Sequence, residues 1–285
     1  MRKYLFFVFL IIGICGQSQS PIASSLLWKI SGNGLTTPSY IFGTFHLMCK
    51  EQFQISQILE EKLFATKQFY GELDMDDPQL QLKMMQEMIM KDKPLSSYLS
   101  AEEYTTLKSG FQKITGMDIS KFDQYKPFLS LSFLLLKTVT CSIVIQPETE
   151  LVQLAKKREM EVLGLETIEE QISAINMEPI DSQIVAIQKM VSNFDSSKNV
   201  MKEMTAVYLK NDAEALYLYI KAHNTNDNFE TALLINRNQK WVPKMKTIMT
   251  NNASFFAVGA GHLGGKNGVL ALLRTEGYVV EPVKY

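Results

Sequence analysis

Histidine and cysteine are scarce in this sequence, which has three of each among its 285 residues. Cys15 lies in the N-terminal apolar segment, so Cys49 and Cys141 are the two cysteines left for the folded chain. Two cysteines form at most one disulfide bond, which excludes a small disulfide-framed fold. The motifs His-Glu-x-x-His and Gly-x-Ser-x-Gly are both absent. Their absence excludes a zincin-type protease and a serine hydrolase with a nucleophile elbow.

A charge excess of either sign is also missing, since 29 lysines and arginines face 30 aspartates and glutamates. The lack of a basic surface argues against nucleic acid as a partner. The partner expected for the site described below is a peptide or small-molecule substrate. After the N-terminal segment, no apolar stretch is long enough to span a bilayer. We therefore expect any membrane anchoring to occur through the N-terminus alone.

The first residues have the features of an export signal. Arg2 and Lys3 precede the apolar run from Tyr4 to Ile14, and small and polar residues follow that run. This pattern predicts a signal peptide over residues 1–18 and an exported protein, periplasmic or extracellular. The alternatives are a lipoprotein attached through Cys15 and a retained N-terminal anchor.

One short pattern occurs twice, near the two ends of the remaining chain. Tyr40 to Leu47 and Phe255 to Leu263 each read as an apolar run followed by Gly-x-x-His-Leu. The apolar runs predict buried strands, and each glycine leaves room for a close backbone or ligand. Because two of the three histidines share this pattern, we predict that His46 and His262 meet at one sheet edge, where α/β folds bind ligands. The third, His223, is expected in a surface loop.

A carboxylate is expected beside these two histidines. A helix over Ile55 to Ala65 and a strand over Gln68 to Asp74 follow the first copy of the pattern. A right-handed crossover makes this strand parallel to the one that precedes His46, so that Glu72 reaches the same edge. Asp74 is interpreted as part of a solvated loop or as a helix cap.

From residue 78 to about residue 250 the pattern is mostly helical and predicts a large helical insertion. Within it, a strand-to-helix junction ends in Glu166, interpreted either as a further carboxylate at the sheet edge or as a helix N-terminal charge. Arg237 follows an apolar turn and suits a clamp on a carboxylate, either that of a substrate or that of Glu166. A solvated helix face is the ordinary alternative for Arg237.

The order of elements predicts a mixed α/β fold in one domain over residues 19–285. Its centre is a mixed β-sheet built from two related halves, flanked by helices and carrying the helical insertion. We also expect residues 127–140 to form a long buried helix, since that segment is almost uniformly apolar. A last strand from Tyr278 to Glu281 is expected beside the strand that carries His262.

At several motifs the chain resembles the TraB/PrgY/GumN family, whose animal relatives are the Tiki proteases and whose fold is similar to that of ChaN-like and erythromycin-esterase-like proteins. The resemblance covers nearly the whole mature chain and is carried, in the family's order, by Gly43-Thr44-Phe45-His46, Glu72, Gly164-Leu165-Glu166-Thr167, Arg237-Asn238 with Trp241, and Gly259-Ala260-Gly261-His262. It implies that both histidines and the glutamate lie in one cleft. It further implies a metal-dependent peptidase that uses manganese or cobalt and acts on small secreted peptides.

The chemistry of these residues leads to the same class of site. Two neutral imidazoles and a carboxylate form a three-ligand set for a divalent ion (Mn, Co or Zn), with positions open for water and a substrate carbonyl. His46, His262 and Glu72 are the first candidates, as ligands and as catalytic residues, and Arg237 is a further catalytic candidate. If Glu72 is instead the general base, Glu166 is the better third ligand.

Two other functions fit the same cleft. One is a metal-independent hydrolase of esters, in which His46 or Glu72 activates water as a general base. The other is a non-catalytic exported protein that binds a peptide, a metal or a haem-like ligand. Activity in the presence of a chelator, or binding without turnover, distinguishes them from a metallopeptidase.

Overall fold

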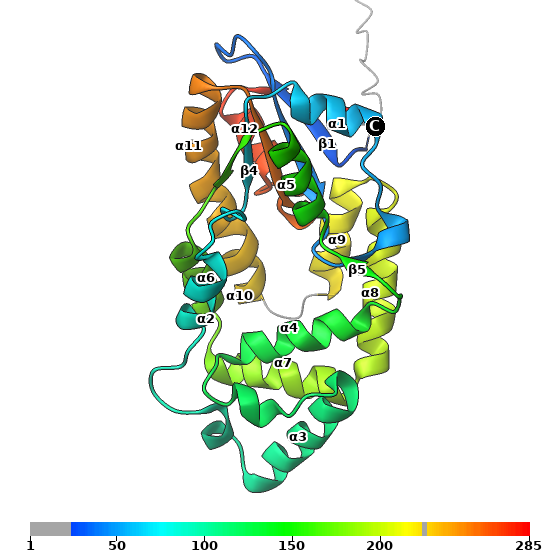
Figure 1. Cartoon of the computed structure of the whole chain (residues 1–285), viewed down its shortest axis with the longest axis vertical. Helices are drawn as coiled ribbons and strands as arrows, with labels where there is room; N and C mark the ends of the chain where they lie inside the picture. Colours follow the sequence, from blue (N-terminus) through cyan, green and yellow to red (C-terminus); the bar gives the residue numbers. More distant parts are fainter. Residues whose placement is uncertain (1–23, 224–226) are drawn as a thin grey trace, which may run out of the picture.

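The computed structural model describes residues 24–223 and 227–285, so the expected signal peptide and Cys15 lie outside the described residues. A six-stranded mixed sheet occupies one end of the molecule, with helices around it (Figure 1). The strand order is β6-β4-β7-β2-β1-β8. The strands of this sheet are β1 (Leu27–Ser31), β2 (Ser39–Thr44), β4 (Gln68–Gly71), β6 (Glu161–Gly164), β7 (Ser254–Gly259) and β8 (Val279–Pro282).

Four neighbouring strands, β6, β4, β7 and β2, are mutually parallel. The two near the centre, β2 and β7, are buried at every residue. Their continuous apolar runs supply side chains to both faces, as central parallel strands require. The carboxyl ends of the four strands therefore lie at the same sheet edge. This arrangement confirms the predicted mixed α/β fold and the predicted parallel orientation of the strand that begins at Gln68. That strand ends at Gly71, so Glu72 lies just after it and not inside it as predicted.

The last strand was predicted in the wrong place. β8 pairs with β1 in antiparallel orientation at the outer edge of the sheet, with Trp28 opposite Pro282, rather than with β7. Both hydrogen-bonding edges of β7 are already taken by β2 and β4. The chain therefore passes beyond β2 and β1 before it finds a free edge.

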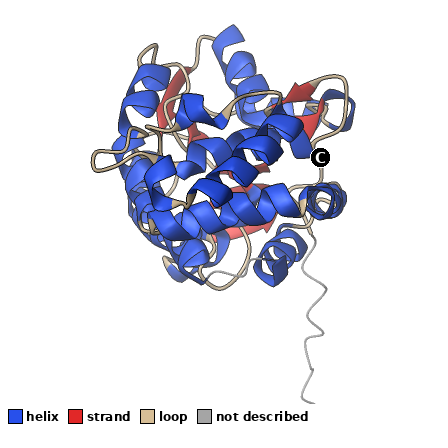
Figure 2. Ribbon diagram, turned by 90° about the horizontal axis from the view of Figure 1, so that it is seen from below, coloured by secondary structure: helices blue, strands red, loops and turns tan. Residues whose placement is uncertain are grey.

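Helices lie on both sides of the sheet and enclose the main core (Figures 1 and 2). Its largest fully buried side chains include Phe42, Phe69, Trp241, Phe255 and Phe256. The helices nearest the sheet are α1 (Gln57–Phe64), α5 (Pro147–Lys157), α11 (Asn236–Asn251) and α12 (Val269–Thr275).

A second, separate core lies in the helical region at the other end of the molecule (Figure 1). Phe111, Leu134 and Ile187 are fully buried there and join three helices of this region, α3, α4 and α7. Among the described residues, no helix is both long enough and apolar enough to cross a membrane. The remaining helices are α2 (Leu80–Glu87), α3 (Ala101–Thr115), α4 (Pro127–Thr138), α6 (Ile168–Asn176), α7 (Ile180–Ser192), α8 (Phe194–Tyr208), α9 (Ala213–His223) and α10 (Asp227–Glu230).

β6 lies inside residues 78–250, where the strand-to-helix junction before Glu166 was predicted, and it completes the central sheet. The helical segment differs from the expectation in two details. α4 is buried along a single stripe that includes Ser130 and Leu134, while Leu136 is 39% exposed. Most of its other residues are only partly buried, so this apolar helix is not buried all round. His223 is exposed but is the last residue of α9 rather than part of a loop.

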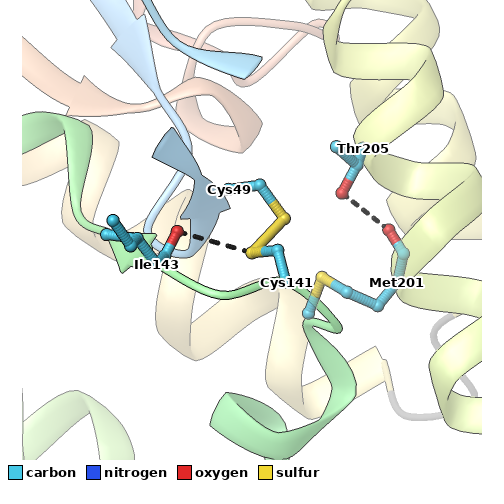
Figure 3. The surroundings of a disulfide bond; sticks show 5 residues. All are labelled: Cys49, Cys141, Ile143, Met201 and Thr205. Carbon is cyan, nitrogen blue, oxygen red and sulfur yellow. Dashed lines mark hydrogen bonds between the residues drawn. A yellow bond between two sulfur atoms is a disulfide. The ribbon is translucent and has the colours of Figure 1, made fainter. Parts of the chain in front are cut away.

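A short two-stranded ribbon connects the sheet to the helical region. β3 (Met48–Cys49) pairs in antiparallel orientation with β5 (Val144–Ile145), and Cys49 forms a disulfide bond with Cys141 (Figure 3). The backbone amide of Lys50 extends the pairing by donating to the carbonyl of Ile143 at 3.0 Å. The ribbon therefore ties together two segments that are 92 residues apart at the disulfide.

Removal of the disulfide is expected to lower stability. A disulfide bond typically stabilises a fold by about 2–4 kcal/mol, because it restricts the unfolded chain. The double variant Cys49→Ser/Cys141→Ser should lose about that much unfolding free energy in urea denaturation. An unchanged midpoint and slope would contradict the assignment of this disulfide.

Candidate active site

The predicted site residues meet at the carboxyl edge of the sheet. His46 follows β2, Glu72 comes directly after β4, and Glu166 follows β6. His262 ends the short helical turn η5 (Ala260–His262) that follows β7. The buried helix α11 adds Arg237 to these four side chains. Since the four strands are parallel and adjacent, residues that are far apart in sequence come within contact of one another.

Arg237 is the centre of the cluster. Its Nη2 lies 2.6 Å from Glu72 Oε2 and 2.6 Å from Glu166 Oε1, and its Nε lies 3.0 Å from Glu166 Oε1. Its Nη1 donates to the carbonyl of Leu233 at 3.0 Å and contacts His262 Nε2 at 3.1 Å. Its Nε also lies 3.1 Å from Glu166 Oε2, so every nitrogen of the guanidinium is engaged by the protein.

Burial lowers the pKa of Arg237, but the two carboxylates outweigh this effect and raise it, so the side chain is a permanent cation. Because its donors are all engaged by the protein, Arg237 is positioned to fix Glu72 and Glu166. A substrate carboxylate would have to displace one of these contacts.

Glu166 is the anchor of Arg237. Besides the guanidinium, its Oε2 accepts a hydrogen bond from Trp241 Nε1 at 3.0 Å, and its Oε1 accepts one from Gln171 at 3.2 Å. The side chain is buried. Both oxygens are therefore committed to protein donors, and the helix N-terminus that follows is capped by a different residue, Thr167.

Glu72 is held at both oxygens as well. Oε2 binds Arg237, whereas Oε1 accepts the backbone amide of Gly259 at 2.8 Å and lies 3.8 Å from His262 Nε2. Burial alone would raise the pKa of Glu72. The nearby Arg237 and the amide of Gly259 lower it instead, well below its usual range. Glu72 is therefore ionised at neutral pH, which suits an anionic ligand better than a proton acceptor.

His262 is a buried, neutral imidazole. Its Nδ1 lies 2.7 Å from Asn238 Oδ1, while Asn238 Nδ2 donates to the carbonyls of His262 and Asn267. This pattern places the ring proton on Nδ1 and leaves the lone pair of Nε2 facing Arg237 and Glu72. Burial lowers the pKa of His262 to about 3. The ring also packs against Trp241, with centroids 4.4 Å apart.

His46 differs from His262 in its surroundings. Its side chain is 66% exposed, and its Nδ1 lies 2.7 Å from Oε1 of Glu148, a buried carboxylate on α5. Thr44 Oγ1 donates to the same oxygen at 2.6 Å. Desolvation lowers the pKa of His46, but Glu148 and, to a lesser extent, Glu72 outweigh it and raise the pKa to about 9.

Glu148 was missed by the sequence analysis. In the sequence it follows Pro147 at the start of a helix, which reads as an ordinary helix N-terminal charge. The packing of α5 on the sheet and the β3–β5 ribbon together bring it to a histidine 102 residues earlier. Asn238 was quoted as part of the Arg237 motif, but its contact with His262 was not foreseen.

The two glycines of the repeated pattern have different roles. A Cβ on Gly259 would lie 3.2 Å from both Glu72 Oε1 and His46 Nε2. Those two atoms therefore face the same small space above the backbone of β7. A Cβ on Gly43 would instead lie 2.7 Å from Leu263 Cδ1 and 2.9 Å from Ala260 Cβ. Gly43 allows η5 to pack closely, and Gly259 leaves room for the site itself.

Residues 26–282 match the sequence profile of the TraB/PrgY/gumN family. The chain belongs to this family. It is 22% identical to "Metalloprotease TIKI2" of Danio rerio, over 93% of this chain and 63% of that protein. It is 23% identical to "Metalloprotease TIKI2" of Xenopus tropicalis (94% of this chain, 62% of that protein) and to "Metalloprotease TIKI1" of Homo sapiens (93% and 63%). The chain thus spans less than two thirds of these relatives. No solved structure matches it.

The names of these relatives imply a metal ion, and the side chains at the sheet edge are of the chemical types that bind one. His46 directs Nε2 toward Glu72 Oε1 and has a carboxylate behind its Nδ1, the usual support of a metal-binding histidine. His262 offers Nε2 with its other nitrogen fixed by Asn238. That Nε2 contacts Arg237, so His262 becomes a ligand only when this contact opens. Glu166 has both oxygens occupied by protein donors.

A second group of donor side chains does not fit. Among the described residues, the only three of His, Cys, Asp or Glu whose ligand atoms all lie within 4.8 Å of one another are Cys49, Glu51 and Cys141. The two cysteines form the disulfide bond, and a disulfide sulfur is not the thiolate that binds metals. By the same measure, the ligand atoms of His46, Glu72 and His262 do not all lie within 4.8 Å of one another. The sheet edge has the right kinds of side chain for a metal centre, but these side chains would have to move closer together to share one ion.

We expect the contribution of His46 to the unfolding free energy of the metal-free protein to decrease as pH rises. The folded pKa of about 9 exceeds the ordinary 6.5. The stabilising effect of the charge is therefore fully present below pH 6.5 and disappears as pH rises through 9. The difference in unfolding free energy between wild type and His46→Gln, measured by urea denaturation with chelator, should shrink over that interval. A pH-independent difference would contradict this picture.

The two glycines provide a matched pair of substitutions. Gly43→Ala forces a methyl group against Ala260 and the Leu263 side chain of the closely packed turn, and should cost about 1–3 kcal/mol of unfolding free energy. Gly259→Ala should cost less stability but shift the His46 ring, because the new methyl group meets the ends of two side chains. Thermal unfolding and the NMR signals of His46 test both expectations. A greater loss of stability in Gly259→Ala would show that the roles are reversed.

Proposed function

We propose that this protein is a metal-dependent hydrolase that cleaves peptides or proteins outside the cytoplasm. The observation that carries the proposal is the convergence of His46 Nε2 and Glu72 Oε1 on the space that Gly259 leaves open, with His262 Nε2 3.8 Å from Glu72 Oε1. Membership of a family with relatives named metalloproteases supports it.

In this proposal, His46, Glu72 and His262 would hold the divalent ion (Mn, Co or Zn). The pKa of His46 is about 9 in the metal-free protein, so binding of the ion would displace the proton from its Nε2. The ion would lower the pKa of a bound water and polarise the scissile carbonyl. Glu72 supplies negative charge without a proton, since its pKa lies below its usual range. His262 is neutral and has its ring proton on Nδ1, so its lone pair is available without deprotonation.

Arg237 and Glu166 serve to position the other residues. The guanidinium fixes one oxygen of Glu72 and thereby orients the other. Glu166 in turn fixes the guanidinium from the opposite side with two oxygens. A preorganised arrangement of this kind needs no reorganisation when charge develops during the reaction.

A metal-independent hydrolase is the second candidate, and one observation favours it. The exposed His46 with Glu148 behind its Nδ1 is the arrangement of a general base and the group that orients it. Because the pKa of His46 is about 9, such a base would work only as pH approaches that value. Ester hydrolysis in chelator that rises up to about pH 9 would favour this function.

The test is hydrolysis of a quenched-fluorescent peptide library by the purified protein. After treatment with chelator, we expect loss of activity and its recovery with Mn²⁺, Co²⁺ or Zn²⁺. His46→Ala and His262→Ala should each reduce the recovered rate by on the order of a hundredfold or more, since loss of a ligand exceeds the effect of losing its hydrogen-bond partner. His223→Ala, on an exposed helix end, is the control. Binding of peptides without cleavage would point to the non-catalytic function.

A further inference from the structure

We propose that Glu148 is a positioning residue that holds the imidazole of His46 with Nε2 directed at Glu72, and that the disulfide-closed ribbon keeps this pair in register. The proposal deepens the function proposed above and rests on it for its catalytic meaning. Its structural content can be tested without any metal. It starts from Glu148, a buried carboxylate outside the three proposed metal ligands.

The contacts of Glu148 are directional. Its Oε1 accepts two hydrogen bonds, from His46 Nδ1 at 2.7 Å and from Thr44 Oγ1 at 2.6 Å. Thr44 is the last residue of β2, so its hydrogen bond fixes the position of the carboxylate relative to the sheet rather than to a loop. A carboxylate behind Nδ1 fixes both the ring orientation and the nitrogen that carries the proton. The remaining nitrogen, Nε2, then faces the space above Gly259.

The ribbon explains how Glu148 reaches His46. His46 lies two residues before β3, and Glu148 lies three residues after the end of β5. Met48 pairs with Ile145 and Cys49 pairs with Val144. The disulfide joins the two strands at the end of the ribbon away from His46 and Glu148. The body of α5 packs on the sheet through Leu151, Val152 and Ala155, and the ribbon fixes the start of the helix next to the end of β2. A ribbon with two residues in each strand is too short to be stable alone, which gives the disulfide its role.

The chain offers a matched control on the same ribbon. Glu150 lies in the same first turn of α5 and binds Lys50 Nζ at 2.7 Å across the ribbon, but on the exposed side. Glu150→Gln thus removes the same charge from the same turn without touching His46. Glu148→Gln keeps the size of the side chain and removes its charge. Any difference between these variants reports the contact with His46 rather than the helix N-terminus.

The experiment compares wild type, Glu148→Gln and Glu150→Gln by calorimetric titration with Mn²⁺, Co²⁺ and Zn²⁺. For Glu148→Gln we expect metal affinity to fall by about 10- to 100-fold, and for Glu150→Gln to stay within about twofold. Circular dichroism establishes that each variant is folded. If Glu148→Gln does not fold, Thr44→Val removes one of the two donors that fix the carboxylate and should weaken metal binding in the same direction.

A second measurement uses the metal-free protein. It distinguishes failure of the proposed function from failure of the positioning role of Glu148. The Nδ1-bound proton of His46 should give a downfield NMR signal in wild type and Glu150→Gln. In Glu148→Gln this signal should move upfield or vanish through exchange with water. If wild type binds no metal but shows this signal, the metallopeptidase function fails and the positioning role stands. An unchanged signal together with unchanged metal affinity in Glu148→Gln would overturn the proposal.

Discussion

The ion pair that Arg237 makes with Glu72 and Glu166 is the interaction on which the sheet edge depends. Two carboxylates from the ends of neighbouring strands converge on one buried cation from α11. Loss of one partner from such a buried pair costs about 3–5 kcal/mol, because a charge is left uncompensated. The arrangement therefore locks β4, β6 and α11 together. It also fixes the carboxylate that would face a metal ion, so one interaction serves both stability and the site.

The repeated Gly-x-x-His pattern produces two histidines with opposite properties. His262 is enclosed by Asn238, Trp241 and Arg237, and burial keeps it neutral. His46 is open to solvent and has an ionised carboxylate behind it, which favours its charged form. Each ring nevertheless has its Nδ1 fixed by a protein oxygen and its Nε2 directed toward Glu72. The same motif thus places one candidate ligand nitrogen in the rigid interior, at His262, and one where substrate or solvent can approach it, at His46.

Much of this arrangement could be predicted from the sequence, because it follows from local pattern and parallel strand order. The apolar runs before His46 and His262 specified buried strands, and a crossover helix specified the direction of the strand that ends near Glu72. Glu148 could not be predicted, since its place depends on a ribbon closed by residues 92 apart. The sequence also could not predict that every nitrogen of the Arg237 guanidinium is engaged by the protein, since this depends on distances between side chains of separate elements. β8 was misplaced because strand neighbours depend on which edges remain free.

The central claim is that His46, Glu72 and His262 form one metal centre. Anomalous X-ray diffraction from a crystal of the full chain soaked in Mn²⁺, recorded at the manganese edge, tests it most directly. The account predicts one strong peak about 2.0–2.3 Å from His46 Nε2 and a Glu72 oxygen, with the Nε2 of His262 turned from Arg237 toward the ion. A peak elsewhere, such as beside Glu51, or no peak at saturating Mn²⁺, would contradict it.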